Sequence, residues 1–444
     1  MNAIGIYPAD FPISQVKMGD KISFWDIICT HGHRRRNEYK NDGINQITSI
    51  QEALMGWIDT TFWMPNTTPR IISPYDVDAY MEPIKINNLG QHYVHINMTD
   101  KKQDREKIDA ALEKKESVGI KIYPDGVTTN FDAGSNENEV SDLRVEKWST
   151  LRTAAGLCLK HKKPLTIHCE TPFMVHEADG ALDFVVNTII PLAEAFPDLD
   201  IVVAHENLMT SAKSIIAHNK KALLNGKKAN IWMELGPKYM TLNRENHLFH
   251  PDTPYGNPLY KCQPRLRSYH NNLSLTSLIA RIGEPWVNVL FSNDHAPHPL
   301  YKKLWFDSKE MMMEYLHKEF QSTDFSEIIK HGWWKVMNKR FTPEVFEKAA
   351  GWIADYRHTV EAALTAALRL AQDVKRFSWL DITYGQLEKY FSGNALELYT
   401  ALEGKWNGTM ATYTREDYSP TEDFYDGKVY NIRKHETLNF KKTA

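Results

Sequence analysis

The chain has 444 residues, a formal net charge of -3 at neutral pH, 42% hydrophobic residues and 25% charged residues. This balance is ordinary for a globular protein with a large core, and it argues against a nucleic-acid or anionic-membrane partner. The four cysteines are scattered without paired spacing, as in reduced intracellular proteins. Since no signal peptide or membrane-spanning segment is evident, we expect a cytoplasmic protein that acts on a small molecule, with a homodimer as an open alternative.

Eight short apolar runs alternate with longer segments of helical periodicity. The runs cover residues 24–33, 59–66, 92–98, 118–124, 163–170, 200–207, 229–236 and 287–294. Between them, segments such as 145–161 and 185–196 repeat apolar residues at intervals of three and four, which is typical of amphipathic helices. Strand and helix alternating in this way predict an α/β fold, the (β/α)8 TIM barrel.

The pattern also suggests a division of the chain. We expect an N-terminal extension at 1–20, the catalytic barrel at 21–298, an insertion packing on the barrel at 299–348, and C-terminal helices with a tail at 349–444. The insertion is rich in methionine and aromatic residues, which favours an amphipathic helix. Residues 351–402 look helical, and residues 426–434 could form a strand or a hairpin.

Polar residues close several of the predicted strands. They are His31, His33, Asn66, His168, His205 and Asp294, and Lys121 lies within the fourth run. TIM-barrel enzymes keep their active sites at the carboxyl ends of the strands. Each residue alone is compatible with a structural role, because buried histidines are commonly hydrogen-bonded in cores and an aspartate before a turn can act as a cap.

Together these residues favour a metal site. Four imidazoles and one carboxylate on one rim supply ligands for about two divalent cations if an additional anion bridges them. Lys121 could become that anion by reacting with carbon dioxide, since burial favours the neutral amine that the reaction requires. Other histidines, His92, His95 and His161 among them, lack this placement, and we expect structural roles for them.

A set of motifs in chain order resembles the dihydroorotases of the shorter bacterial type, in the amidohydrolase superfamily. The motifs are "HGHRR", "MPN", "KIYPDGVTTN", "IHCE", "AHEN" and "NDHAPHPLYKK". The last one meets the family pattern of Asp, any residue, Ala-Pro-His, four residues and Lys at Asp294, Ala296, Pro297, His298 and Lys303.

The resemblance implies a role for each matching residue. His31, His33 and Asp294 would bind one metal ion, His168 and His205 the other, and carbamylated Lys121 would bridge two ions that are expected to be Zn2+. The residues expected to contact the substrate are Arg35, Asn66, Thr128, Thr129, His298 and Ala350 with its neighbour Gly351. Asp294 would also be catalytic, moving a proton between the attacking water and the amide nitrogen.

The chain departs from the family pattern near its first motif, where Gly32, Arg34 and Arg36 stand in place of the usual residues. We interpret "RRR" as one guanidinium that grips a carboxylate, with the other two solvated or paired. The expected function is that of a dihydroorotase interconverting N-carbamoyl-L-aspartate and dihydroorotate in pyrimidine synthesis. The alternatives are another cyclic-amide hydrolase, such as a hydantoinase or dihydropyrimidinase, and a catalytically silent structural homologue.

Overall fold

The structure of the chain is a computed structural model. The structure describes residues 5–17, 19–36, 49–50, 53, 58–87, 89–124, 149–169, 177–237, 240, 269–294, 308, 310–311, 314, 381–399, 402 and 410–414. No described helix is long and apolar enough to cross a membrane.

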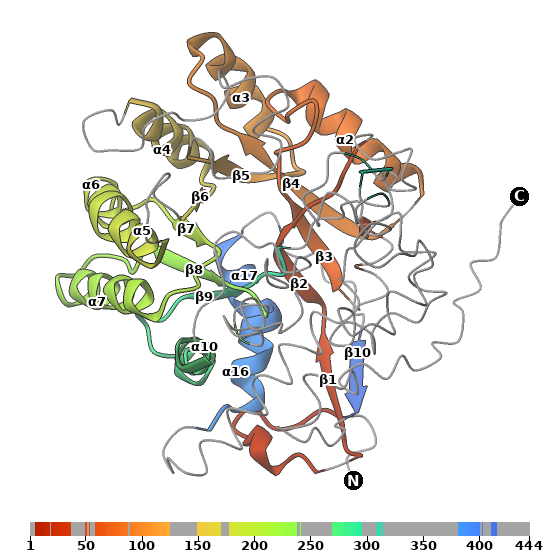
Figure 1. Cartoon of the computed structure of the whole chain (residues 1–444), viewed down its shortest axis with the longest axis vertical. Coiled ribbons are helices and arrows are strands. Elements are labelled where there is room, and N and C mark those ends of the chain that lie inside the picture. Colours follow the sequence, from red (N-terminus) through yellow and green to blue (C-terminus); the bar gives the residue numbers. More distant parts are fainter. Residues whose placement is uncertain are drawn as a thin grey trace, which may run out of the picture.

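Eight strands form one sheet in which each strand pairs in parallel with the next along the chain (Figure 1). They are β2 (Ile27–Gly32), β3 (Ile58–Trp63), β4 (Gln91–Asn97), β5 (Ser117–Ile122), β6 (Leu165–His168), β7 (Ile201–Ala204), β8 (Ile231–Leu235) and β9 (Val289–Phe291). The last strand returns to the first, because the Thr30 hydroxyl donates to the Phe291 carbonyl at 3.0 Å and the Asp294 amide donates to the His31 carbonyl at 2.9 Å. The predicted (β/α)8 barrel is therefore confirmed.

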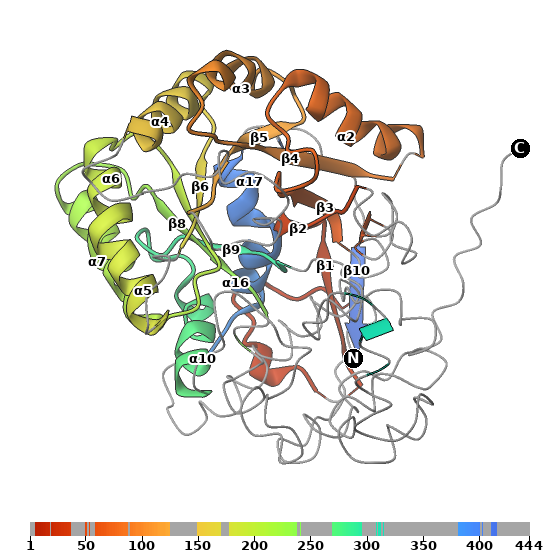
Figure 2. The ribbon, with the colours of Figure 1, turned by 45° about the horizontal axis from the view of Figure 1, so that its top comes forward.

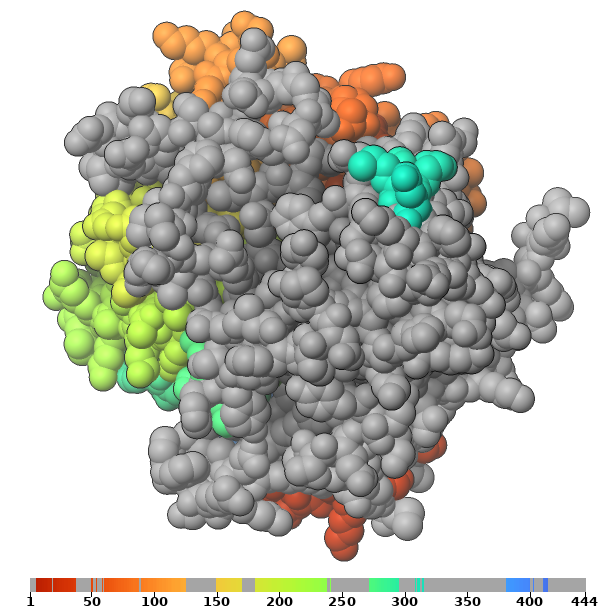
Figure 3. Space-filling model, viewed as in Figure 1, coloured from red at the N-terminus to blue at the C-terminus, as the bar shows by residue number. Residues whose placement is uncertain are grey.

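The helices that follow the strands lie outside the ring, whereas the C-terminal helices lie within its outline in this view (Figure 2). Together they are α2 (Pro74–Ile86), α3 (Arg105–Leu112), α4 (Ser149–His161), α5 (Glu177–Phe184), the π-helical turn η5 (Val185–Ile189), α6 (Ile190–Ala195), α7 (Met209–Leu224), α10 (Tyr269–Thr276), α16 (Tyr384–Glu388), the π-helical turn η9 (Lys389–Gly393) and α17 (Asn394–Leu398). Three-residue 3-10 turns occur at η1 (Ile13–Gln15), η3 (Lys102–Asp104) and η7 (Ile279–Arg281). The space-filling view shows α5 to α7, in yellow-green, and α3, in orange, at the outer surface (Figure 3).

The first predicted strand is divided in the structure, which corrects the expectation of one continuous run at 24–33. Asp26 adopts a positive φ of 46° between β1 (Lys21–Trp25) and β2. Strand β1 leaves the barrel and pairs antiparallel with β10 (Met410–Thr414) in a separate two-stranded sheet. The left-handed conformation of Asp26 turns the chain between two apolar segments. The continuous apolar run in the sequence therefore contains two strands and not one.

Apolar side chains fill the amino-terminal end of the barrel. This interior cluster contains Ile28, Phe62, Tyr93, Val118, Val202, Trp232 and Leu290 from the strands, with Ala395, Leu398, Tyr399 and Leu402 from α17 and the residues after it. The rings of Phe62 and Tyr399 meet edge to face at 4.5 Å. Since this end is closed by hydrophobic packing, polar groups inside the barrel gather toward the carboxyl ends of the strands.

The C-terminal helical prediction is confirmed for the described part, where α16, η9 and α17 lie between residues 384 and 398. Residues 351–380 and the expected strand at 426–434 lie outside the described residues, as does nearly all of the insertion at 299–348. The proposed division into an extension, a barrel, an insertion and a tail therefore stays a prediction.

Candidate active site

A bulge in β2 turns its two histidines into the barrel. Cys29 pairs with Thr61, but the next pairing joins Gly32 to Trp63, so β2 contains one extra residue. Trp63 packs in the hydrophobic cluster between the outer face of the sheet and the surrounding helices. Its partner Gly32 therefore also faces outward. Because side chains alternate along a strand, His31 and His33 on either side of Gly32 point inward.

Asp294 lies among three of the predicted histidines. Its Oδ1 atom is 3.2 Å from His33 Nε2 and 3.5 Å from His31 Nε2, and its Oδ2 atom is 3.3 Å from His205 Nδ1. His205 and Asp294 follow β7 and β9 with φ of 60° and 49°. Non-glycine residues rarely adopt this left-handed conformation, and strained positions of this kind cluster at functional sites.

The remaining predicted histidine completes a chain of imidazole rings. His168, the last residue of β6, lies 4.9 Å from the ring of His205, which lies 4.2 Å from the ring of His31. All of these side chains are almost completely buried. The structure thus brings together the four histidines and the aspartate that the sequence placed on one rim.

Asn66 joins the same site. Its Oδ1 atom is 3.0 Å from Nδ1 of His33, so the imidazole donates this hydrogen bond and keeps Nε2 toward Asp294. The "MPN" motif therefore holds a predicted metal ligand in a defined orientation.

Lys121 is the fifth of the six residues of β5 and has no solvent exposure. Its Nζ atom has no hydrogen-bond partner among the described residues, and it lies 5.3 Å from the ring centre of Tyr123. Burial lowers the pKa of Lys121 to about 8, although the carboxylates of Glu234 and Asp294 oppose this effect. A buried amine that approaches neutrality and lacks a partner is well suited to react with carbon dioxide or to meet a ligand.

Two of the histidines beside Asp294, His31 and His33, favour the neutral form. Burial lowers the pKa of His31 well below its usual range, with the positive charges of His205 and Lys121 acting in the same direction. Burial also lowers the pKa of His33, although Asp294 opposes this shift. Neutral imidazoles offer a nitrogen lone pair, which is the form that binds a metal.

Glu234 belongs to the site although the sequence prediction did not include it. It lies on β8 with no solvent exposure, and its Oε2 atom is 2.7 Å from Nδ1 of His31. The signal was present in "IWMELG", where an acidic residue interrupts a buried run just as Lys121 does. Burial raises the pKa of Glu234 to about 8, against the opposing charge of Lys121.

Two groups of side chains have the spacing of metal ligands. One contains His31, His33 and Asp294, and the other contains His31, His205 and Glu234, with the ligand atoms of each group within 4.8 Å of one another. Imidazole nitrogens with carboxylate oxygens are the ligand set of zinc and related divalent ions.

The three consecutive arginines differ in their surroundings. The Arg34 guanidinium stacks 3.6 Å from the ring centre of Tyr80 and donates to the Tyr80 carbonyl. Arg36 donates to the Pro69 carbonyl at 3.5 Å. Arg35 is buried and follows His33 by two residues. By resemblance to the dihydroorotases, this residue is expected to contact the substrate.

Other predicted contacts lie outside the described residues. They are Thr128, Thr129, His298, Ala350 and Gly351. Two of the histidines expected to be structural make hydrogen bonds away from the site. His161 lies 2.6 Å from a carboxylate oxygen of Asp109, and His92 lies 2.9 Å from the Leu89 carbonyl.

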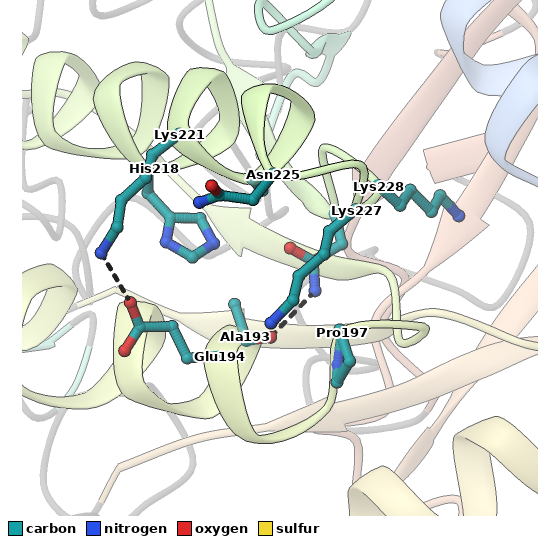
Figure 4. Close-up of a pocket in the computed structure, with 10 residues that line it drawn as sticks. Ala193, Glu194, Pro197, His218, Lys221, Asn225, Lys227 and Lys228 are labelled. Carbon is teal, nitrogen blue, oxygen red and sulfur yellow. Dashed lines mark hydrogen bonds and ion pairs between the residues drawn. The ribbon is translucent and has the colours of Figure 1, made fainter.

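A separate pocket opens between α6, α7 and the segment before β8 (Figure 4). It lies at the amino-terminal end of β8, whereas the histidines and Asp294 lie at the carboxyl ends of the strands. Its lysines include Lys221, 3.6 Å from Glu194, and Lys228, 2.6 Å from Asp200. Each of these two lysines therefore has a carboxylate partner.

The chain is similar in sequence to proteins named dihydroorotase. No known family model matches it. The dihydroorotase of Coxiella burnetii is 27% identical over 245 residues, which cover 54% of this chain and 63% of the relative. The alignment therefore spans less than two thirds of that curated relative.

Solved structures share the fold. The chain superposes on the dihydroorotase of Campylobacter jejuni with a TM-score of 0.58 and 20% identity, covering 90% of both chains. A dihydropyrimidinase from Brevibacillus agri gives a TM-score of 0.59 and 14% identity, covering 89% of this chain and 74% of the other. At these identities the comparison establishes the barrel fold, and the sequence relatives carry the resemblance to dihydroorotases.

Proposed function

We propose that this chain is a metal-dependent cyclic amide hydrolase, a dihydroorotase that interconverts N-carbamoyl-L-aspartate and (S)-dihydroorotate in pyrimidine biosynthesis. The observation that carries the proposal is the meeting of His31, His33 and His205 around Asp294, beside the buried amine of Lys121, which makes no hydrogen bond to a described residue. The relatives named dihydroorotase support the choice of reaction. A cytoplasmic location and a homodimer belong to the same proposal.

The residues of the site fit two divalent ions. His31, His33 and Asp294 would hold one ion, His168 and His205 the other, and Lys121 would bridge them as a carbamate, with zinc as the expected metal. Two features support this fit. The pKa values of His31 and His33 are lowered, and neither Lys121 Nζ nor His31 Nε2 makes a hydrogen bond within the described residues.

When bound, such ions would acidify a water molecule and polarise the ring carbonyl that it attacks. Asp294 accepts the proton of that water and delivers it to the departing amide nitrogen, and ring closure reverses these two transfers. His33 and His205 lie within 3.3 Å of its two carboxylate oxygens and fix its orientation. The interior apolar cluster closes the far end of the barrel and excludes bulk water from that side.

The substrate carboxylate would lie against Arg35, Asn66 and His298. Arg35 is buried, where a charge-assisted bidentate bond to a carboxylate is strong. The Asn66 oxygen is engaged by His33, so its amide group would be the part that donates to the substrate. Thr128, Thr129 and Ala350 are proposed as further contacts by resemblance.

A second candidate is a hydantoinase or dihydropyrimidinase, favoured by the equal structural similarity to the Brevibacillus agri enzyme. A catalytically silent homologue is the remaining alternative, and the intact set of ligand residues argues against it. The three differ in whether any ring is opened and whether the ring must carry a carboxylate.

The test compares dihydroorotate, dihydrouracil and hydantoin as substrates of metal-replete wild type and Arg35→Met. Wild type should open dihydroorotate selectively, and Arg35→Met should lose about two to three orders of magnitude in kcat/KM while retaining its metals, because truncating a buried charge pair costs several kcal/mol. Preference for the uncharged rings, with unchanged kinetics in Arg35→Met, would support the second candidate. Absence of turnover on all three would support the silent homologue.

A further inference from the structure

Glu234 lies on β8, and β9 separates this strand from β2, which carries His31. Two residues before it on β8, Trp232 belongs to the interior cluster, so the alternation of side chains directs Glu234 inward as well. There its Oε2 atom is 2.7 Å from His31 Nδ1, and neither side chain is exposed to solvent. A carboxylate buried at this position needs a partner of opposite or donor character, and His31 supplies it.

This contact determines which nitrogen of His31 carries the proton. A metal ion can bind Nε2 only when the imidazole proton is on Nδ1, and in that state the ionised carboxylate of Glu234 accepts the hydrogen bond from Nδ1 while Nε2 keeps its lone pair. Nε2 is the nitrogen that faces Asp294, 3.5 Å away, and it makes no hydrogen bond to any described residue. The arrangement leaves a lone pair directed at the proposed metal position.

Glu234 could alternatively serve as a counter-ion for Lys121. Lys121 Nζ makes no hydrogen bond within the described part of the chain, whereas the contact between Glu234 and His31 is short. It could also ligate a metal directly, because it forms a ligand group with His31 and His205. The engagement of Oε2 by the His31 proton favours an indirect role.

We propose that Glu234 is the positioning residue of the metal centre, holding the Nδ1 proton of His31 and thereby presenting Nε2 to the ion. The proposal rests on the proposed function only for the presence of metal at His31. Hydrogen-bonded partners of this kind orient a ligating imidazole and raise its basicity, and their loss typically weakens metal binding by about 10- to 100-fold.

The experiment measures the zinc affinity of Glu234→Ala and Glu234→Gln by competition with a chelator, together with the number of ions bound at saturation. Glu234→Ala should bind about 10- to 100-fold more weakly with an unchanged number of ions, and Glu234→Gln should lie between it and wild type because the amide oxygen still accepts the Nδ1 proton. The visible spectrum of the cobalt-loaded protein should change in both variants.

Glu116→Gln is the matched control. Glu116 is also largely buried, but it precedes β5 at the amino-terminal end and pairs with Lys85 at 2.8 Å. The zinc affinity and the spectrum of Glu116→Gln should therefore equal those of wild type.

Zinc affinity within twofold of wild type in both Glu234 variants would overturn the proposal, and so would loss of one ion at saturation, which marks a direct ligand. If Glu234→Ala fails to fold, the nearly isosteric Glu234→Gln provides the test. Weaker metal binding in the Glu234 variants of a protein that leaves dihydroorotate intact would uphold this proposal and refute the proposed substrate.

Discussion

Replacing Lys121 by methionine separates the effect of this lysine on stability from its proposed role in metal binding. The side chain is completely buried in β5, and burial lowers its pKa from 10.5 to about 8. Methionine is unbranched, apolar and of similar length, so it can occupy the same space without a charge. In the metal-free protein we therefore expect Lys121→Met to be more stable than wild type.

The magnitude follows from the pKa shift. Since the folded protein binds the lysine proton less tightly than the unfolded chain, the penalty is fully present below pH 8 and disappears as the pH rises toward 10.5. At pH 7 it amounts to about 3 kcal/mol, and this is the expected gain in unfolding free energy. The gain should shrink above pH 8, and metal binding and turnover should be lost at every pH.

The assay is urea unfolding in the presence of a chelator at several pH values, followed by metal analysis and kinetics of the reloaded protein. Lys213→Met, at an exposed position of α7, is the control and should change stability by no more than about 0.5 kcal/mol. A metal-free Lys121→Met that is no more stable than wild type would refute the argument about burial. A variant that keeps its metals and its activity would refute the role as a bridge.

Two further predictions concern a proton carrier and a buried imidazole. Asp294→Asn should fold and lose about 10²- to 10⁴-fold in kcat, because an amide cannot accept the proton of the attacking water; unchanged kcat would exclude Asp294 as the base. Burial lowers the pKa of His92 to about 4, so the unfolded chain binds an extra proton below pH 6.5 and wild type should lose about 2 kcal/mol through this residue between pH 7 and 5. In thermal or urea unfolding, His92→Phe should show a smaller loss over the same interval, and an equal loss would contradict the assignment.

The sequence allowed the barrel to be predicted because its strands are buried on both faces and appear as short apolar runs. All eight runs correspond to strands, and the polar residues at their ends meet as the topology of a barrel requires. The break at Asp26 was missed because a single residue at positive φ leaves no trace in the hydrophobic pattern.

Glu234 and the bulge in β2 show what the sequence did not reveal about the site. His31, His33 and Asp294 were predicted because polar residues at the carboxyl ends of barrel strands point to an active site. Glu234 was missed because it lies within a strand and contacts the site through His31. The inward direction of His31 depends on one extra residue between Cys29 and Gly32, which is a property of pairing between strands and not of local sequence.

The central claim is that the residues around Asp294 form a binuclear metal centre that opens the dihydroorotate ring. The most direct measurement titrates metal-free protein with Zn2+ in bicarbonate buffer while the ring opening of dihydroorotate is followed. The account predicts that turnover rises with added metal and reaches its plateau at about two ions per chain. A plateau at one ion, or no turnover with any amount of Zn2+, Mn2+ or Co2+, would contradict it.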